Sequence, residues 1–235
     1  MSSPPPRGSV VVPALDEEAY LPVLLESVQA QTLPVHEVIV ADAGSRDGTV
    51  GLARATGATV VAGGHPGLGR NVGAEAASGD WLLFLDADVR LPPDALETAF
   101  REMEREGLEA ASCWFVPDEG GPVLRLNHWL SSLYFRVTSR VGWPHSIGAF
   151  LLLPTRVHEE IGGFDLSIRV AEDQDYVRRI ARVVRYGFLR RPEVEIAARR
   201  FEAEGGILVS LKWLGIELHR LVIGEIRGDY FRYFK

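Results

Sequence analysis

The sequence predicts an α/β fold in which a mostly parallel central sheet is flanked by helices. In the first half of the chain, short runs of β-branched residues alternate with amphipathic segments, as in parallel strands joined by crossover helices. Carboxylates follow three of the first four predicted strands, and the rhythm becomes mixed beyond Gly107. A length of 235 residues with 46% hydrophobic residues fits one large globular domain.

The first half is expected to contain four strands and four helices. Strands are read from apolar runs and helices from apolar residues at helical spacing. The strands are placed at 9–13, 37–41, 58–62 and 81–85, and the helices at about 18–30, 48–56, 68–77 and 94–106. We expect Asp47 to cap the second helix, Gly57 to end it, and Pro93 to lie in the first turn of the fourth.

The second half is expected to mix strands and helices and to supply the other side of a cleft. It contains the apolar run AASCWFV, a long amphipathic stretch at 123–140, the apolar strand IGAFLLLP, a helix that opens at Ala171 and a strand that includes VEIA. The connectors near Gly120, Pro144 and Gly205 are short, and no repeat or low-complexity linker is visible. A single domain over 1–235 is therefore predicted.

The composition argues against some classes of function. A formal net charge of -7 argues against binding to nucleic acid, which usually requires a basic surface. The single cysteine, Cys113, cannot form an intramolecular disulfide, so a reducing compartment is expected. There is no basic and then apolar leader and no run of about twenty apolar residues, so we expect a cytoplasmic protein.

Acidic residues gather where the predicted strands end, which is where ligands bind in open α/β sheets. They are Asp16, Glu17 and Glu18 after the first strand, Asp42 and Asp47 after the second, and Asp86 and Asp88 after the fourth. Such clustering is hard to explain by packing alone.

The pair Asp86 and Asp88, separated by Ala87, follows the apolar run WLLFL. Two hard oxygen ligands at a sheet edge suit Mg²⁺ or Mn²⁺ bridging a diphosphate, whereas the alternative is that they cap a helix or decorate a turn. Because Asp94 is already able to open the next helix, both acids are left without a structural role, and this favours a metal site.

The other acids and arginines each have two interpretations. Asp42 can accept a hydrogen bond from a base or ribose, whereas Asp47 is expected to act as a helix cap. Arg70, in the opening turn of a helix with Asn71, can contact a phosphate or a base edge, or can be a solvated residue. Arg199 and Arg200 can close over a diphosphate, or can equally be a solvated pair.

Three acids open the helix that begins near Ala171, namely Glu172, Asp173 and Asp175. They either favour the helix N-terminus electrostatically or include a general base that removes a proton from a hydroxyl. Asp173 is the predicted base, with Glu172 as its positioning neighbour. His145 is more often structural at such a position than a metal ligand or substrate contact.

In their order and spacing these segments resemble glycosyltransferase family 2 over roughly residues 9–181. The segments are VVVPALDEEAYLPVLLESVQAQ, EVIVADAGSRDGT, GRNVGAEAASGDWLLFLDAD, IGAFLLLPTRVHEEIGGFD and AEDQDYVRRI. The resemblance implies a GT-A fold with a Rossmann-like sheet, a nucleotide-sugar donor such as a UDP- or GDP-sugar, Mn²⁺ or Mg²⁺, and inversion at the anomeric carbon.

Carried over by position, the resemblance implies a role for each matching residue. Asp173 would be the catalytic base beside Glu172, Asp88 a metal ligand, and Asp86 a ligand of the metal or the ribose. The nucleotide-sugar site would include Pro13, Ala14, Glu17, Asp42, Arg70 and Ala87, and Arg199 and Arg200 are added to it from the reasoning above. Two positions depart from the family pattern, since Asp16 stands where the family usually has Asn and Ala43 where it usually has a second Asp. These departures leave open which nucleotide base the donor site prefers.

The domain is expected to comprise three parts. About 8–106 would bind the nucleotide-sugar, about 107–205 the acceptor, and about 206–235 would form an amphipathic helix and tail. The apolar stripe of that helix comprises Ile207, Leu211, Leu214, Leu218 and Leu221, and the tail GDYFRYFK is aromatic and basic. This segment allows peripheral contact with the inner face of the cell membrane and with a lipid-linked acceptor, or packing against protein.

Two other functions remain as alternatives. A sugar nucleotidylyltransferase would carry a glycine-rich loop with Arg and Lys after the first strand, where this chain reads PALDEE. A non-catalytic nucleotide-binding protein would need no base, so the order of Glu172 and Asp173 favours an enzyme.

Overall fold

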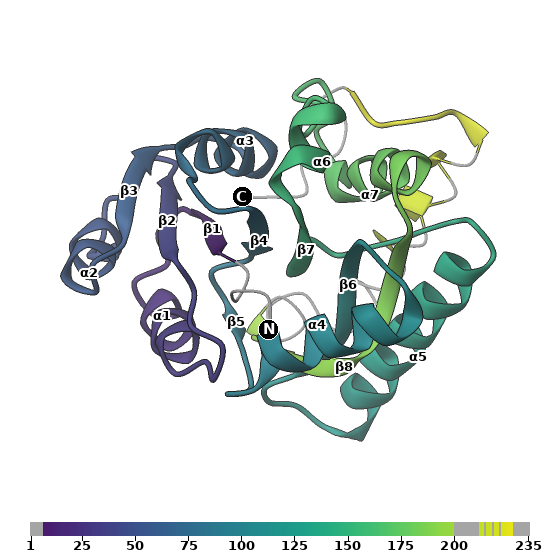
Figure 1. The fold of residues 1–235 in the computed structure, drawn as a ribbon, viewed down its shortest axis with the longest axis horizontal. Coiled ribbons are helices and arrows are strands. Elements are labelled where there is room, and N and C mark those ends of the chain that lie inside the picture. Colours follow the sequence, from purple (N-terminus) through teal and green to yellow (C-terminus); the bar gives the residue numbers. More distant parts are fainter. Residues whose placement is uncertain (1–6, 200–211, 214, 218, 221, 228–235) are drawn as a thin grey trace, which may run out of the picture.

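The computed structural model describes residues 7–199, 212–213, 215–217, 219–220 and 222–227. These residues form a mixed sheet of eight strands, ordered β3-β2-β1-β4-β7-β6-β8-β5 and flanked by helices (Figure 1). The strands are β1 (Gly8–Ala14), β2 (Glu37–Asp42), β3 (Thr59–Ala62), β4 (Trp81–Leu85), β5 (Val89–Arg90), β6 (Ala110–Pro117), β7 (Phe150–Pro154) and β8 (Tyr186–Ile196). The helices are α1 (Leu21–Gln29), α2 (Thr49–Ala55), α3 (Pro66–Ala76), α4 (Ala95–Glu106), α5 (Pro122–Arg140), α6 (Thr155–Glu160) and α7 (Glu172–Val183). The predicted α/β class is confirmed.

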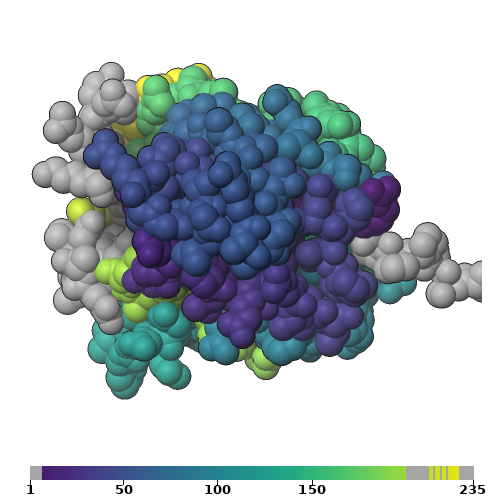
Figure 2. Space-filling view, turned by 90° about the vertical axis from the view of Figure 1, so that its left-hand side faces the viewer, coloured from purple at the N-terminus to yellow at the C-terminus, as the bar shows by residue number. Residues whose placement is uncertain are grey.

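The first half is the parallel part of the sheet. β1 pairs in parallel with β2 and with β4, and β2 with β3. Each predicted strand of this half agrees with the structure to within one residue at either end. The helices α1, α2 and α3 lie on the side of the molecule that faces the viewer in Figure 2, where this half of the chain is coloured purple and blue.

Several helix ends of the first half differ from the prediction, and α3, for example, begins at Pro66 rather than at about Leu68. α1 begins at Leu21 because Pro22, which has no N–H to donate, lies in its first turn. The N-cap residue of α2 is Gly48, but a carboxylate oxygen of Asp47 accepts the Thr49 N–H at 3.0 Å. Pro93 is not in the first turn of α4, because that helix begins after Asp94.

Alternating side chains of the central strands build two apolar layers, one on each face of the sheet. Val10, Val12, Leu83 and Leu85 pack with α1, α2 and α4, whereas the intervening side chains pack with α3, α6 and α7. This double burial explains why WLLFL is a continuous apolar run.

The second half continues the sheet with mixed directions. β7 runs antiparallel between β4 and β6, and β8 pairs in parallel with β6 and antiparallel with β5. The sequence analysis located only the end of β8 and did not find β5. β7 thereby brings the residues just before Phe150 to the end of β4, since Leu85 pairs with Phe150.

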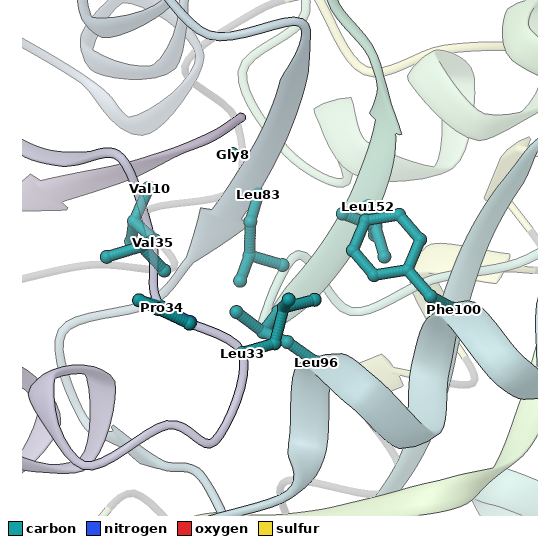
Figure 3. A pocket seen from close by; sticks show the side chains of 9 residues that line it. All are labelled: Gly8, Val10, Leu33, Pro34, Val35, Leu83, Leu96, Phe100 and Leu152. Atoms are coloured by element: carbon teal, nitrogen blue, oxygen red, sulfur yellow. The ribbon is translucent and has the colours of Figure 1, made fainter. Parts of the chain in front are cut away.

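A small apolar cavity of about 10 Å³ lies between the sheet and α4 (Figure 3). It is lined by residues that include Gly8 and Val35, which precede or begin β1 and β2, and Phe100 of α4. A space of this size holds one water at most, and an apolar lining does not favour even that. The cavity is therefore a packing defect at the edge opposite to the acidic loops.

The predictions for the C-terminal segment lie outside the described residues. These are Arg200, the apolar stripe from Ile207 to Leu221, and the aromatic residues Tyr230, Phe231, Tyr233 and Phe234. Among the residues that the structure describes, no helix is both long enough and apolar enough to cross a membrane.

Candidate functional site

The loops after β1, β2 and β4 leave the sheet at the same edge. Ala14 pairs with Asp42 across β1 and β2, and Val11 pairs with Phe84 across β1 and β4. Glu17, Asp42 and Asp86 therefore follow neighbouring strand ends. In addition, α3 contributes Arg70, α7 contributes Glu172 and Asp173, and the end of β8 leads to Arg199.

Arg70 forms the first of two arginine-centred clusters. It is only 3% exposed, and its two terminal nitrogens donate to Asp86 Oδ1 and Glu172 Oε1, each at 2.8 Å. Burial opposes its charge, but the carboxylates of Asp86 and Glu172 raise the pKa of Arg70 above its usual value. The interpretation of Arg70 as a solvated residue is wrong, and it is instead the buried cation that joins α3, α7 and the β4 end.

The backbone around Arg70 leaves room for this guanidinium. Gly148 has φ +74°, and a Cβ atom there would lie 2.7 Å from Arg70 Nη2 and 3.6 Å from Asp173 Oδ2. A larger residue would be strained and would push into the cluster. The glycine in the segment before β7 is therefore required by the arginine beneath it.

Arg199 forms the second cluster. Its terminal nitrogens donate to the two oxygens of Glu17 at 2.6 and 2.9 Å, and its Nε donates to Asp88 Oδ2 at 3.1 Å. The guanidinium also lies over the Tyr20 ring, 4.6 Å from its centre. Burial opposes its charge, but the hydrogen bonds that Arg199 donates to Glu17 and the charge of Asp88 raise the pKa of Arg199. The interpretation of Arg199 as part of a solvated pair is thus wrong.

The motif Asp86-Ala87-Asp88 is divided between the two arginines. Asp86 pairs with Arg70 and Asp88 with Arg199, so the expectation that these acids have no structural partner is wrong. The sequence could not reveal this, because Arg199 lies 111 residues beyond Asp88. The two acids still share one edge of the site.

Asp173 is a buried carboxyl group on the first turn of α7. It is 7% exposed, and its Oδ1 accepts the N–H of Gln174 at 2.9 Å. Burial, followed by the nearby charge of Glu172, raises the pKa of Asp173 to about 8. A carboxyl group that exchanges its proton near neutral pH has the property required of a general base or acid.

Other acids of the strand ends hold loops together. Asp16 accepts the N–H of Arg46 at 2.8 Å, Glu18 that of Gly48 at 2.8 Å, and Asp47 that of Glu18 at 3.1 Å. Asp42 accepts the N–H groups of its own turn, from Gly44 and Ser45. The loops after β1 and β2 are thereby fixed to each other.

The remaining predicted residues lie around this edge. Pro13 and Ala14 end β1, and the side chains of Ala14 and Ala87 are buried in the core. His145 is 1% exposed, and its Nδ1 lies 2.9 Å from the carbonyl oxygen of Trp143, which indicates a structural role.

Two residues of the site were missed by the sequence analysis. Tyr20 supplies the ring beneath Arg199, and Gln174 connects α7 to the segment before β7 through the backbone of Ser146. The only available signal was nearness in the sequence, since Tyr20 lies three residues after Glu17 and Gln174 directly follows Asp173.

The donor set fits a divalent cation that protein and ligand hold together. Among the described residues, no group of three or more His, Cys, Asp or Glu side chains is arranged to hold a metal. Asp86 and Asp88 nevertheless supply hard oxygens, and Mg²⁺ is commonly held by one or two carboxylates with substrate phosphates and waters. Four carboxylates also pair with only two guanidinium groups in the two clusters, which favours an added cation.

The comparison with protein families gives one match. The model of the family described as glycosyl transferase family 2 matches residues 9–162. This range includes β1 to β4 and both acids of the Asp86-Ala87-Asp88 motif.

Individual proteins resemble the chain over different lengths. An uncharacterized glycosyltransferase of Haemophilus influenzae is 28% identical over 183 residues, which are 73% of this chain and 61% of the relative. An undecaprenyl-phosphate 4-deoxy-4-formamido-L-arabinose transferase of Aeromonas hydrophila is 41% identical over 101 residues, which are 37% of this chain and 31% of the relative. The chain thus spans less than two thirds of the length of these relatives.

A solved structure shares the fold. The mannosyltransferase of Pyrobaculum calidifontis in complex with GDP-Man and Mn²⁺ superposes with a TM-score of 0.66 at 24% identity. The match covers 82% of this chain and 57% of that protein.

Proposed function

This chain belongs to glycosyltransferase family 2, and from that premise we propose that it transfers a sugar from a nucleotide-sugar donor to an acceptor hydroxyl, with inversion and with the aid of a divalent metal. The observation that carries the proposal is the meeting of Asp86, Asp88 and Asp173 with one buried and one half-buried arginine at one sheet edge. A non-catalytic binding protein would not need the raised pKa of Asp173.

The donor occupies the edge formed by the ends of β1, β2 and β4. Asp88, with Asp86, would hold Mn²⁺ or Mg²⁺, which when bound neutralises the charge that develops on the leaving diphosphate. Glu17, Asp42 and Arg70 line the nucleotide side, together with Pro13, Ala14 and Ala87. The superposed mannosyltransferase that contains GDP-Man and Mn²⁺ supports a donor and metal of this kind.

Arg199 changes partners when the donor binds. In the structure it neutralises Glu17 and Asp88, and both carboxylates must be released for the proposed roles. A diphosphate offers the same guanidinium a bidentate partner at the same edge. Arg200 would contribute to the same contact.

Asp173 is the general base. The acceptor oxygen attacks the anomeric carbon, its proton passes to an Asp173 oxygen, and the bond from that carbon to the diphosphate breaks on the opposite face. Burial raises the pKa of Asp173, and the charge of Glu172, which is itself held by Arg70, raises it further. Direct displacement of this kind reverses the anomeric configuration and forms no covalent intermediate with the enzyme.

The acceptor is a hydroxyl group on a lipid-linked molecule. The undecaprenyl-phosphate transferase similar to this chain supports a lipid-linked acceptor. A phosphate monoester, with a second pKa near 6, is already ionised at neutral pH and needs no base. The presence of Asp173 with a pKa of about 8 therefore favours a hydroxyl as the attacking group.

A thermal-shift screen of nucleoside diphosphates and their sugars, with and without Mn²⁺, tests the donor site. We expect one nucleotide to raise the Tm of the wild type in the presence of Mn²⁺ and to have no effect on Asp88→Ala. Asp80→Ala is the control, since Asp80 is exposed and precedes β4 at the opposite end. Absence of any response in the wild type would contradict the proposal, as would an equal response in Asp88→Ala.

A further inference from the structure

The 19-residue helix α5 turns most of its large apolar side chains to solvent, whereas Phe135 packs against the core. Its fully buried residues are the polar His128 and Ser132. Large exposed apolar residues recur at helical spacing along the outer side, and they are Val123, Leu126, Leu130, Leu133 and Val137, followed by Val141 just beyond the helix. A helix that packs on a sheet normally buries its apolar stripe, so the exposed stripe of α5 is unusual.

Polar contacts hold α5 in this orientation. The hydroxyl of Ser132 lies 3.4 Å from the backbone nitrogen and oxygen of Phe115 in β6. Arg136 donates to the carbonyl oxygen of Phe188 in β8 at 2.8 Å and to Glu106 of α4 at 3.1 Å. These directional contacts would be lost if the helix turned its apolar stripe inward.

The exposed stripe is bordered by aromatic and basic residues. Trp129, Tyr134 and Trp143 are exposed near its sides, and so are Arg125 and Arg140. α5 contains three arginines and no acid, although the whole chain has 32 acidic and 25 basic residues. Aromatic rings and arginines beside an apolar stripe fit the boundary between the headgroups and acyl chains of an anionic bilayer.

We propose that this stripe, the α5 face (Val123, Leu126, Leu130, Leu133 and Val137), docks on a lipid surface that contains anionic headgroups. A helix of this length extends about 29 Å and lies in the plane of the interface. α5 is at the outer edge of the molecule, away from β1, β2 and β3 (Figure 1). The exposed arginines Arg125 and Arg140 beside the stripe favour anionic over neutral lipid.

The α5 face adjoins the acceptor side of the site. The Tyr134 hydroxyl lies 3.4 Å from His145 Nε2, and Ser146 is joined to Gln174, the residue after Asp173. Docking through α5 therefore brings a lipid-linked acceptor to the half that contains the base. This inference rests on the proposed function for the identity of the acceptor, but not for the binding itself.

Co-sedimentation with vesicles tests the inference. We expect the full chain to bind vesicles of equimolar phosphatidylcholine and phosphatidylglycerol more tightly than vesicles of phosphatidylcholine alone. Leu126→Glu/Val137→Glu should weaken this binding at least about tenfold, through lost apolar burial and added negative charge. Val23→Glu/Val183→Glu is the matched control, because it places the same charges at exposed apolar positions of α1 and α7. That control should bind as the wild type does.

Several results would overturn the inference. They are equal binding by the two double variants, no binding by the wild type, or a wild-type dimer that the α5 variant abolishes in sedimentation velocity. A lower Tm in the α5 variant than in the control, without vesicle binding by the wild type, would mean that the chain itself covers the face. Mn²⁺-dependent nucleotide binding is measured in parallel and should be unchanged in both variants, so failure of docking and failure of the donor site are distinguished.

Discussion

Replacing Asp173 by Asn tests the raised pKa of the proposed base through protein stability. The amide mimics the protonated acid, so the variant keeps the neutral form at every pH. In the wild type, the pKa of Asp173 rises from 3.8 in the unfolded chain to about 8 in the folded protein. Between pH 3.8 and about pH 8, the folded state retains a proton on Asp173 that the unfolded state has lost. The stability that Asp173 contributes is therefore complete below pH 3.8 and is lost as pH rises through 8.

The pKa difference sets the size of the effect. About four pKa units at about 1.4 kcal/mol each correspond to roughly 6 kcal/mol. Asp173→Asn should therefore match the wild type near pH 4 and exceed its free energy of unfolding by roughly that amount near pH 9.

Urea unfolding at both pH values measures the difference. Asp175→Asn is the control, because Asp175 lies on the same helix but forms a partly exposed ion pair with Arg179 at 2.7 Å. Its substitution should change stability by no more than about 1 kcal/mol at either pH. A wild-type pH dependence that persists unchanged in Asp173→Asn would refute the reasoning.

Three further predictions follow from the two clusters. Arg199→Ala should lower the free energy of unfolding by about 1 kcal/mol and strengthen Mn²⁺ binding without nucleotide, because Glu17 and Asp88 lose their partner. Urea unfolding measures the first effect and calorimetric titration the second, and an unchanged Mn²⁺ affinity would contradict the prediction. Gly148→Ala should destabilise the protein by about 2 kcal/mol in urea unfolding, because φ is +74° and the new Cβ would lie 2.7 Å from Arg70 Nη2. The control Gly51→Ala, in open space within α2, should stabilise the protein slightly. In a pH–rate profile, log kcat/KM should rise with pH up to about 8 and then level, because the base must be ionised; a profile flat below pH 8 would exclude Asp173 as that base.

Local patterns of the sequence predicted the first half of the fold well. The strands β1, β2 and β4 contain buried apolar runs, β3 is a half-exposed edge strand, and acids or glycines mark the ends of all four, so their limits could be read within a residue. Helix starts were less well predicted where a proline was involved, since Pro93 precedes α4 whereas Pro22 lies inside the first turn of α1.

Contacts between distant residues were not predictable from the sequence. Arg199 meets Glu17 across 182 positions, and Arg70 meets Glu172 across 102. Neither spacing leaves a local pattern, so the pairing of the acids with arginines became visible only in the structure. The same holds for α5, because its amphipathic spacing does not say which side faces the sheet.

A transfer assay tests the central claim most directly. Labelled sugar from the donor found in the screen would be supplied with Mn²⁺ and a lipid-linked acceptor, and the anomeric configuration of the product would be determined by NMR. We predict a product of inverted configuration with the wild type. Asp173→Asn should still bind the donor but should transfer at least about a hundredfold more slowly. A product of retained configuration, or undiminished transfer by Asp173→Asn, would contradict the account.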